Sequence, residues 1–259
     1  MNETKMFHLG LYPEDGAEYA ILPGDPGRVP KIAAYLENPK QVAYNREFQT
    51  WSGMLCGKRI LVTSTGIGGP STAIAVEELS SIGVTTMIRV GTCGGMQLKV
   101  AGGDLVIPTG AIRFEGTSRE YVPIEFPAVP DYTVTSALIQ AAGDLGFTFH
   151  TGVTQSKDSF YGQHSPERMP ASPELQYKWE AWKKAGCLAS EMECAALFIT
   201  SAVLGCKSGC VLNAIWNQER AKAGLPNPEI NDTTRAIKIA VHALELLINN
   251  KSAKKDEKF

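Results

Sequence analysis

The hydrophobic positions of the chain fall into short apolar runs that alternate with longer stretches of helical periodicity. Runs rich in Val, Ile and Leu are typical of buried strands, and they occur at residues 19–22, 59–63, 85–90, 104–107, 151–154 and 209–213. Apolar residues recurring every three to four positions predict helices at 29–36, 71–82, 135–145, 175–185, 193–204 and 233–248. Strand and helix alternate, which favours a largely parallel sheet covered by helices on both faces.

The same pattern predicts a single domain. No Pro-, Gly- and Ser-rich linker and no internal repeat divides the sequence, so residues 1–250 are expected to fold as one unit. The chain has 259 residues, 44% of them hydrophobic and 20% charged, which suits one large α/β domain. The remaining segment, 251–259, is rich in charge and is expected to be a disordered tail.

Charge and composition narrow the class of partner and the compartment. Lys and Arg number 25 against 27 Asp and Glu, so neither nucleic acid nor an anionic membrane is the expected partner. Residues 1–8 lack the basic start and apolar run of a signal peptide, and we therefore expect a cytoplasmic protein. The six cysteines lie scattered in apolar context, which predicts free, mostly buried thiols rather than disulfides or a zinc site.

Glycine-rich segments follow several of the predicted strands, where ligands bind in α/β folds. They are residues 23–28, 64–71 and 91–95, and their backbone N–H groups can approach an anion closely. The second segment has Ser71 where a dinucleotide fingerprint needs its third glycine, and the next strand ends in Arg89 rather than in a carboxylate. A nicotinamide cofactor is therefore not expected, and the absence of a Walker A lysine removes the main support for ATP.

Arginines near these segments are candidates for binding an anion. Arg28 ends the first segment, and Arg89 lies just before Gly91 and Thr92. A guanidinium fork matches the geometry of phosphate, so both side chains can face one anion. The alternative is that Arg28 caps a loop and that Arg89 pairs with a carboxylate at the edge of the core. Arg46 is either a third ligand or an ordinary surface charge.

Taken in order along the chain, these motifs resemble those of the nucleoside phosphorylase family. The segments that carry the resemblance are 7–11, 23–29, 46–48, 64–71, 89–92, 160–163 and 190–193, and the match runs from about His8 to Asn249. The resemblance implies a single-domain α/β fold with a central mixed, partly barrel-like sheet flanked by helices. It also implies reversible phosphorolysis in pyrimidine salvage, in which uridine or deoxyuridine and phosphate give uracil and the sugar 1-phosphate.

The resemblance also implies roles for individual residues and a homohexamer built as a trimer of dimers with shared sites. The implied phosphate ligands are Gly24, Arg28, Arg89, Thr92 and, from the neighbouring subunit, Arg46. The implied ribose ligands are His8 across the interface, Thr92, Glu191, Met192 and Glu193, and those for the base are Phe160, Gln163, Arg168, Ile215 and Trp216. Arg89, Glu193 and Gln163 would carry the catalysis. No cofactor is required besides phosphate as co-substrate, although Glu47, Ile67 and Ser71 match positions that hold potassium between two subunits in some relatives.

The residue types agree with this chemistry. Phosphate held by arginines stabilises a cationic ribose and supplies the nucleophile. Glu193 can bind the 2′- and 3′-hydroxyls of the sugar; alternatively, it is a helix-start carboxylate near a favourable dipole. Uracil leaves as an anion unless donors share its charge, and an amide from Gln163 together with an arginine supplies such donors.

Two segments depart from the pattern of the best-known bacterial members. Gln163 and Arg168 are separated by extra residues, so His164 can occupy part of the space that Arg168 would fill. Near the last predicted strand, Asn217 is followed by Gln218 rather than by arginine, and Gln218 or Arg220 is the candidate replacement. Trp216 either lines the base pocket or supports the sheet.

Three other functions share parts of this pattern. A purine nucleoside phosphorylase typically carries an aspartate at the position of Asn217, to protonate the purine ring. A nucleosidase that uses water has no need of the arginine cluster. A non-catalytic nucleoside-binding protein would not need to retain Arg28, Arg89, Thr92 and Glu193 together.

Overall fold

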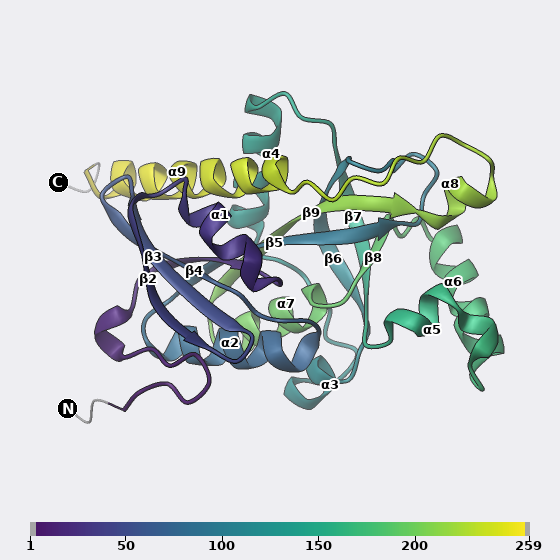
Figure 1. Cartoon of the computed structure of the whole chain (residues 1–259), viewed down its shortest axis with the longest axis horizontal. Helices are drawn as coiled ribbons and strands as arrows, with labels where there is room; N and C mark the ends of the chain where they lie inside the picture. Colours follow the sequence, from purple (N-terminus) through teal and green to yellow (C-terminus); the bar gives the residue numbers. More distant parts are fainter. Residues whose placement is uncertain (1–3, 257–259) are drawn as a thin grey trace.

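The strands join into one mixed sheet in the computed structural model, which describes residues 4–256 (Figure 1). Their bounds are β1 Tyr19–Pro23, β2 Glu37–Asn45, β3 Phe48–Leu55, β4 Lys58–Thr63, β5 Thr86–Gly95, β6 Leu105–Phe114, β7 Phe149–Lys157, β8 Ala189–Glu191 and β9 Lys207–Asn217. The sheet has nine strands in the order β2-β3-β4-β1-β5-β8-β7-β6-β9. Because β5 also pairs with β9, the strands β5, β8, β7, β6 and β9 close into a barrel.

The pairing directions confirm the mixed, partly barrel-like sheet implied by the family resemblance. Strands β1, β4, β5 and β9 run parallel to their neighbours within this group, as do β6, β7 and β8. The pairs β2–β3, β3–β4, β5–β8 and β6–β9 are antiparallel. The largely parallel sheet predicted from alternation alone therefore describes only part of the sheet.

Helices cover both faces of the sheet, as the alternation predicted (Figure 1). Their bounds are α1 Val29–Ala33, α2 Gly69–Ser81, α3 Thr117–Tyr121, α4 Tyr132–Asp144, α5 Phe160–His164, α6 Ser172–Lys184, α7 Cys194–Val203, α8 Gln218–Lys222 and α9 Thr234–Asp256. Helices α1, α4 and α9 share one hydrophobic core with the sheet, and α2 and α7 share another. Neighbouring residues of β1 alternate between the two, since Ile21 belongs to the first core and Leu22 to the second.

Helices α5, α6 and α8 gather at the open end of the barrel, on the right of Figure 1. Short 3-10 turns complete the chain at Pro13–Asp15, Pro26–Arg28 and Pro166–Arg168. The second of these turns follows β1, so it brings Arg28 to the carboxyl ends of the parallel strands. That edge of the sheet is where α/β folds bind their ligands.

Every strand and helix expected from the hydrophobic pattern forms, with shifted bounds, but the segment 91–95 is a correction. It is not a loop, because β5 continues through it to Gly95. The glycines there allow close packing rather than a turn: a Cβ on Gly91 would lie 2.7 Å from Leu212 Cδ2, and one on Gly95 would lie 2.6 Å from Asn217 Nδ2. A strand that turns within a barrel needs such small residues.

The C-terminal helix extends past the domain boundary predicted at residue 250. Helix α9 continues as far as Asp256, into the segment 251–259 for which the sequence predicts a disordered tail; the last part of that prediction, 257–259, lies outside the described residues.

All six cysteines are free, and four of them are buried. Between residues 4 and 256, no helix is both long and apolar enough to span a membrane.

Candidate active site

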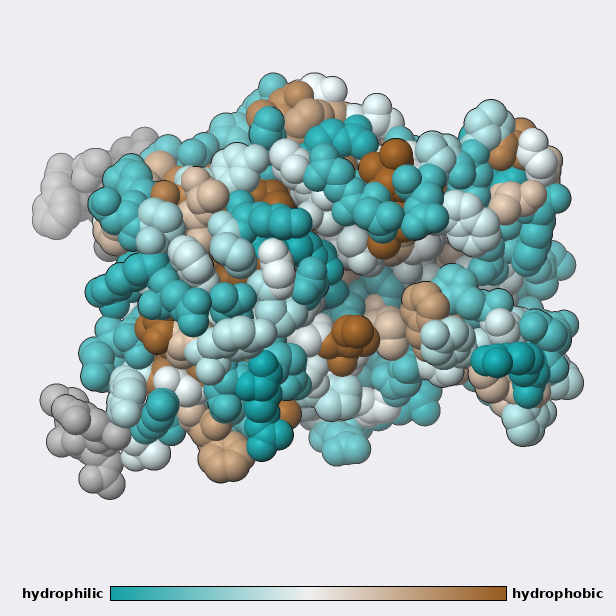
Figure 2. Space-filling view, viewed as in Figure 1, coloured by the Kyte–Doolittle hydropathy of each residue, from teal (hydrophilic) through white to brown (hydrophobic). Residues whose placement is uncertain are grey.

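A cavity of about 870 Å³ opens where β1, β5, β8 and β9 end. Figure 2 shows that this face of the molecule is hollowed near its centre, with both hydrophobic and hydrophilic residues at the border. The predicted site residues that line the cavity are Gly24, Arg28, Glu47, Ile67, Arg89, Thr92, Phe160, Gln163, Glu191, Met192, Glu193, Ile215 and Trp216. The structure thus brings together residues that lie far apart in the sequence.

A buried ion pair between Arg89 and Glu193 forms one wall of the cavity. Arg89 is 3% exposed and Glu193 is 5% exposed, and Nη2 of the arginine donates to Oε2 of the carboxylate at 2.5 Å. The other carboxylate oxygen accepts from the backbone N–H of Gly68 at 2.7 Å, a residue whose φ of 89° favours glycine. Glu193 therefore fixes both the arginine and the glycine-rich loop 64–71.

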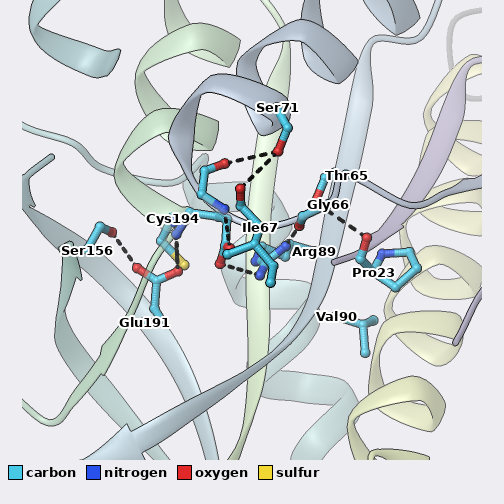
Figure 3. Close-up of polar contacts among 12 residues, drawn as sticks. Pro23, Thr65, Gly66, Ile67, Ser71, Arg89, Val90, Ser156, Glu191 and Cys194 are labelled. Carbon is cyan, nitrogen blue, oxygen red and sulfur yellow. Dashed lines mark hydrogen bonds and ion pairs between the residues drawn. The ribbon is translucent and has the colours of Figure 1, made fainter. Parts of the chain in front are cut away.

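One N–H of the Arg89 guanidinium has no hydrogen-bond partner in the protein. Its Nε is buried and has no partner among the described residues, while Nη1 lies 3.4 Å from Thr65 Oγ1 (Figure 3). Nε lies beside Gly91, where a Cβ would be 3.2 Å from it. The terminal nitrogens are the atoms nearest the cavity-lining Gly24, since a Cβ there would be 3.6 Å from Nη2.

Two arginines lie at this end of the cavity, each near a carboxylate. Burial lowers the pKa of Arg28, and the charge of Arg89 lowers it further. Burial alone would lower the pKa of Arg89, but the negative groups around it, Glu193 first among them, together raise it. Nε of Arg28 lies 3.9 Å from Oδ2 of Asp25, and each guanidinium has more N–H donors than its one neighbouring carboxylate needs.

Glu191 caps the N-terminus of α7. Its Oε2 accepts from the backbone N–H groups of Glu193 and Cys194 at 2.7 and 2.8 Å, and its Oε1 accepts from the hydroxyl of Ser156 (Figure 3). Burial raises the pKa of Glu191, and the charge of Glu193 raises it further. Glu191 thus satisfies the free N–H groups at the helix start, which leaves Glu193 to face the cavity.

The other end of the cavity combines an aromatic wall with hydrogen-bonding side chains. Phe160 and His164 on α5 lie with their ring centroids 4.3 Å apart. Gln163, between them in the sequence, accepts a hydrogen bond on Oε1 from Ser190 Oγ at 2.5 Å. The Ser190 hydroxyl is equally close, at 2.5 Å, to Oε1 of the buried Gln155, and its single proton can serve only one of the two amide oxygens at a time.

His8 and Arg46 lie away from this cavity. The imidazole Nδ1 of His8 is 2.7 Å from Oε1 of Glu78 on α2, and its backbone carbonyl accepts from Asn45 Nδ2 at 2.8 Å. Arg46 follows Asn45 in the exposed turn between β2 and β3, with a φ of 54°. The two predicted ligands are thus near each other, on a surface that does not belong to the chain's own cavity.

Arg168, Arg220 and Asn217 also do not line the cavity. Arg168 is exposed and its guanidinium lies 5.8 Å from the ring centroid of Tyr161. Arg220 donates to the backbone carbonyls of Pro226 and Leu98. Asn217 is fully buried; its Oδ1 caps α8 and its Nδ2 donates to two backbone carbonyls.

The three residues matched to a potassium site lie together at the glycine-rich loop. Ser71 Oγ donates to the carbonyl of Ile67 at 3.2 Å (Figure 3), and a Cβ on Gly66 would lie 2.7 Å from Glu47 Cγ. A carboxylate, a carbonyl and a hydroxyl are oxygen ligands, which suit a hard cation. In the part of the chain that the structure describes, no cluster of His, Cys, Asp and Glu has the composition of a transition-metal site.

Lys157 and Ser190 are functional candidates that the sequence reading did not select. Lys157 is 4% exposed, ends β7 and lines the cavity. Its Nζ donates to Ser190 Oγ at 2.8 Å. The signal that could have found this lysine is its position at the carboxyl end of a strand, a few residues before Phe160.

The fold thus places two arginines, a buried carboxylate and an aromatic wall around one cavity. Comparison with known proteins agrees: the sequence profile of the phosphorylase superfamily matches residues 18–247, and the chain belongs to this superfamily. The resemblance to nucleoside phosphorylases drawn from the motifs is confirmed.

Individual relatives are similar over nearly the whole chain. The chain is 54% identical to uridine phosphorylase of Treponema pallidum, over 95% of each protein. It is 43% identical to uridine phosphorylase of Escherichia coli, over 96% of this chain and 100% of the relative. It is also 39% identical to guanosine phosphorylase of Halorubrum lacusprofundi, over 94% of this chain and 100% of that protein.

Proposed function

We propose that the chain catalyses the reversible phosphorolysis of uridine and deoxyuridine, as a cytoplasmic enzyme of pyrimidine salvage. The observation that carries the proposal is the buried pair of Arg89 and Glu193 at one wall of the cavity, with Arg28 lining the same cavity. The names and high identity of the uridine phosphorylases add independent support. The reaction needs phosphate as co-substrate and no organic cofactor.

Phosphate binds at the arginine end in this proposal. Arg28, Arg89 and Thr92 line that part of the cavity together with Gly24, which lies against the terminal nitrogens of Arg89. Guanidinium groups bind phosphate through charge-assisted hydrogen bonds. They hold the nucleophilic oxygen against the anomeric carbon and place a negative charge beside the developing ribose cation.

Glu193 binds the ribose hydroxyls. Each of its carboxylate oxygens accepts one bond from the protein, and a carboxylate has further lone pairs for the 2′- and 3′-hydroxyls. The ion pair with Arg89 orients the carboxylate, so one carboxylate links the sugar to the phosphate site. The alternative role as a helix-start cap belongs instead to Glu191.

The base lies at the end lined by Phe160, Gln163 and Trp216. The ring of Phe160 supplies a flat apolar surface, and the amide of Gln163 donates to a carbonyl of the pyrimidine. When the glycosidic bond breaks, its electron pair passes into the ring and charge collects on the carbonyl oxygens. Donors at these oxygens lower the barrier because they bind the anion more strongly than the intact nucleoside.

The direct test is release of free base with and without phosphate. Purified protein incubated with uridine is expected to form uracil and ribose 1-phosphate in equal amounts, and only when phosphate is present. Uracil formed at the same rate without phosphate would identify a nucleosidase. Uridine that binds without being cleaved under either condition would identify a binding protein.

A purine nucleoside is the second candidate substrate, because one relative is named guanosine phosphorylase. The identity to that relative is 39%, against 54% for a uridine phosphorylase. Asn217 does not decide the choice directly, because its side chain is buried away from the cavity. The choice therefore depends on the residues around the base, and it is tested by the nucleoside panel discussed below.

We further propose that the active sites are shared between subunits of a homohexamer arranged as a trimer of dimers. The support is that His8 and Arg46, which match ligands in the family, lie near each other but away from the chain's own cavity. In a twofold dimer each subunit can place this surface at its partner's cavity. Glu47, Ile67 and Ser71 would then hold a potassium ion between the two subunits.

Mixing inactive subunits tests the shared site. Arg46→Ala and Glu193→Ala are each expected to be nearly inactive, but reassembled mixtures are expected to regain roughly a quarter of the wild-type sites, because a mixed dimer has one intact site. The measurement is uracil release after subunit exchange, with exchange followed by differently tagged chains. Mixing Glu193→Ala with Arg89→Ala is the matched control, because both changes affect the same half of the site. Exchanged mixtures of the first pair that remain as inactive as this control would exclude the shared site.

A further inference from the structure

The base end of the cavity holds a buried lysine that the proposed mechanism has not used. Lys157 ends β7 and is 4% exposed. It lines the cavity described above and also a second cavity of about 620 Å³, and Gln163 and Trp216 line both as well. A lysine in this position is nearly removed from water, which costs free energy unless its charge has a function or a partner.

The contacts of Lys157 place its ammonium group with the residues that face the base. Nζ donates to Ser190 Oγ at 2.8 Å, and that hydroxyl also contacts Gln163 Oε1 at 2.5 Å. Nζ lies 6.0 Å from the ring centroid of Phe160. The lysine, Gln163 and the buried Gln155 therefore share one neutral hydroxyl, and further N–H bonds of the ammonium remain to bind an oxygen of a ligand.

The arginines that were expected to serve the base are held elsewhere. Arg168 is exposed beside Tyr161, and Arg220 donates to backbone carbonyls. Neither of them lines the cavity. In the described part of the chain, the cations that do line it are Arg28 and Arg89, at the phosphate end, and Lys157.

We infer that Lys157 is a catalytic residue whose ammonium stabilises the departing pyrimidine anion, an inference that rests on the proposed phosphorolysis. An oxygen of phosphate bonds to C1′ as the C1′–N1 bond breaks, and the electron pair of that bond passes into the ring. Nζ–H donates to the carbonyl oxygen on which the charge collects. Hydrogenphosphate loses its proton as it becomes the sugar phosphate, and the base gains one, so protons balance.

The charges around Lys157 set the pH at which it acts. Burial lowers the pKa of Lys157 to about 8, although the carboxylates of Glu191 and Glu193 oppose the shift. Burial also lowers the pKa of His164 and raises the pKa of Cys93 well above its usual value, so these two neighbours stay neutral near pH 8. Lys157 is charged below pH 8 and loses its charge as the pH rises through that value.

A leaving-group comparison separates this role from a structural one. Lys157→Met is expected to lower kcat/KM for uridine roughly fiftyfold. For 5-fluorouridine we expect a loss that is roughly ten times smaller, about fivefold, because its fluorine stabilises the base anion and makes the cation less necessary. A variant that merely disturbs the cavity would slow both substrates equally.

The pH profile gives a second readout that does not depend on one variant. For the wild type, kcat/KM for uridine is expected to fall as the pH rises through about 8, and this limb is expected to be missing in Lys157→Met. A fall in kcat/KM caused by ionisation of the substrate itself would occur at the same pH in the wild type and in Lys157→Met. Lys157→Arg keeps the charge and is expected to recover part of the activity.

The controls make each outcome decisive. Lys178→Met, at a half-buried lysine of α6 that pairs with Glu174 and does not line the cavity of the proposed site, is expected to match the wild type in every assay. If the wild type does not cleave uridine, the proposed function fails. If it does, but Lys157→Met is slowed equally on both nucleosides and keeps the wild-type pH profile, the role of Lys157 is wrong. If Lys157→Met does not fold, the wild type is tested alone. A pH profile of kcat/KM that is the same for both substrates and does not fall near pH 8 overturns the inference.

Discussion

Replacing Arg89 with methionine is expected to lower kcat/KM for phosphate by about a thousandfold, because this side chain is the most deeply buried cation of the phosphate site. Methionine fills a similar volume but offers neither the charge nor the N–H donors. The loss is expected to exceed that from changes at the base, because Arg89 also orients Glu193 and thus the sugar. The measurement is initial rate against phosphate concentration at saturating uridine.

The variant also leaves the carboxylate of Glu193 buried without its partner, which costs about 3 to 5 kcal/mol of stability. Thermal unfolding and near-UV circular dichroism therefore accompany the assay. Arg89→Lys keeps a positive charge but lacks the fork, and it is expected to remain folded and strongly impaired. Arg59→Met is the matched control, since Arg59 lies on β4 and donates to the carbonyl of Glu14. An Arg89→Lys protein with wild-type dependence on phosphate would remove Arg89 from the phosphate site.

Most of the fold could be predicted because its strands are buried. Strands β1 and β5 have apolar residues on both faces of the sheet, for example Ile21 and Ile88 on one face. Such apolar runs are visible in the sequence. Strands β2 and β3 were not predicted, because β2 is exposed and polar along Glu37–Asn45 and β3, Phe48–Leu55, mixes polar residues and a glycine with its apolar ones. Strand β8, at Ala189–Glu191, is too short to show a period, and closure of the barrel depends on pairings between distant segments that local patterns do not encode.

The candidate site likewise has one part that could be predicted from the sequence and one part that could not. The glycine-rich segments and the arginines beside them have a local signature, so Arg28 and Arg89 could be selected from the sequence as an anion site. Both alternatives considered for Arg89 turn out to be compatible, because it pairs with the carboxylate of Glu193 and also lines the cavity. One guanidinium has enough donors for both roles.

The base end was harder to predict, because it depends on how short helices turn after β7 and β9. The extra residues after Gln163 form the turn Pro166–Arg168, which carries Arg168 to the surface. Asn217 caps α8 instead of facing the cavity. Lys157 lines the cavity instead, and its candidate role at the base follows only from the three-dimensional contact with Ser190. Motif spacing alone cannot reveal such a replacement.

Uridine is expected to be cleaved at least roughly a hundredfold faster than cytidine, measured as kcat/KM with saturating phosphate. Gln163 and Lys157 line the cavity; the amide NH₂ of the first and the ammonium of the second are donors. Both donors can bind the carbonyl oxygen of uracil. Cytosine presents an amino group at the same position, and a donor that meets another donor in a buried site leaves both unpaired.

Inosine and guanosine complete the panel, and uridine is expected to be the better substrate by roughly a hundredfold or more as well. A purine leaves readily when a ring nitrogen takes up a proton, whereas Phe160, Gln163 and Trp216, which line the base end, carry no carboxylic acid to supply one. Equal kcat/KM for cytidine and uridine would show that Gln163 and Lys157 do not read the base. Equal kcat/KM for guanosine and uridine would establish the second candidate function. The ammonium of Lys157 would then be assigned to a purine ring atom, and the assignment of the phosphate site would not change.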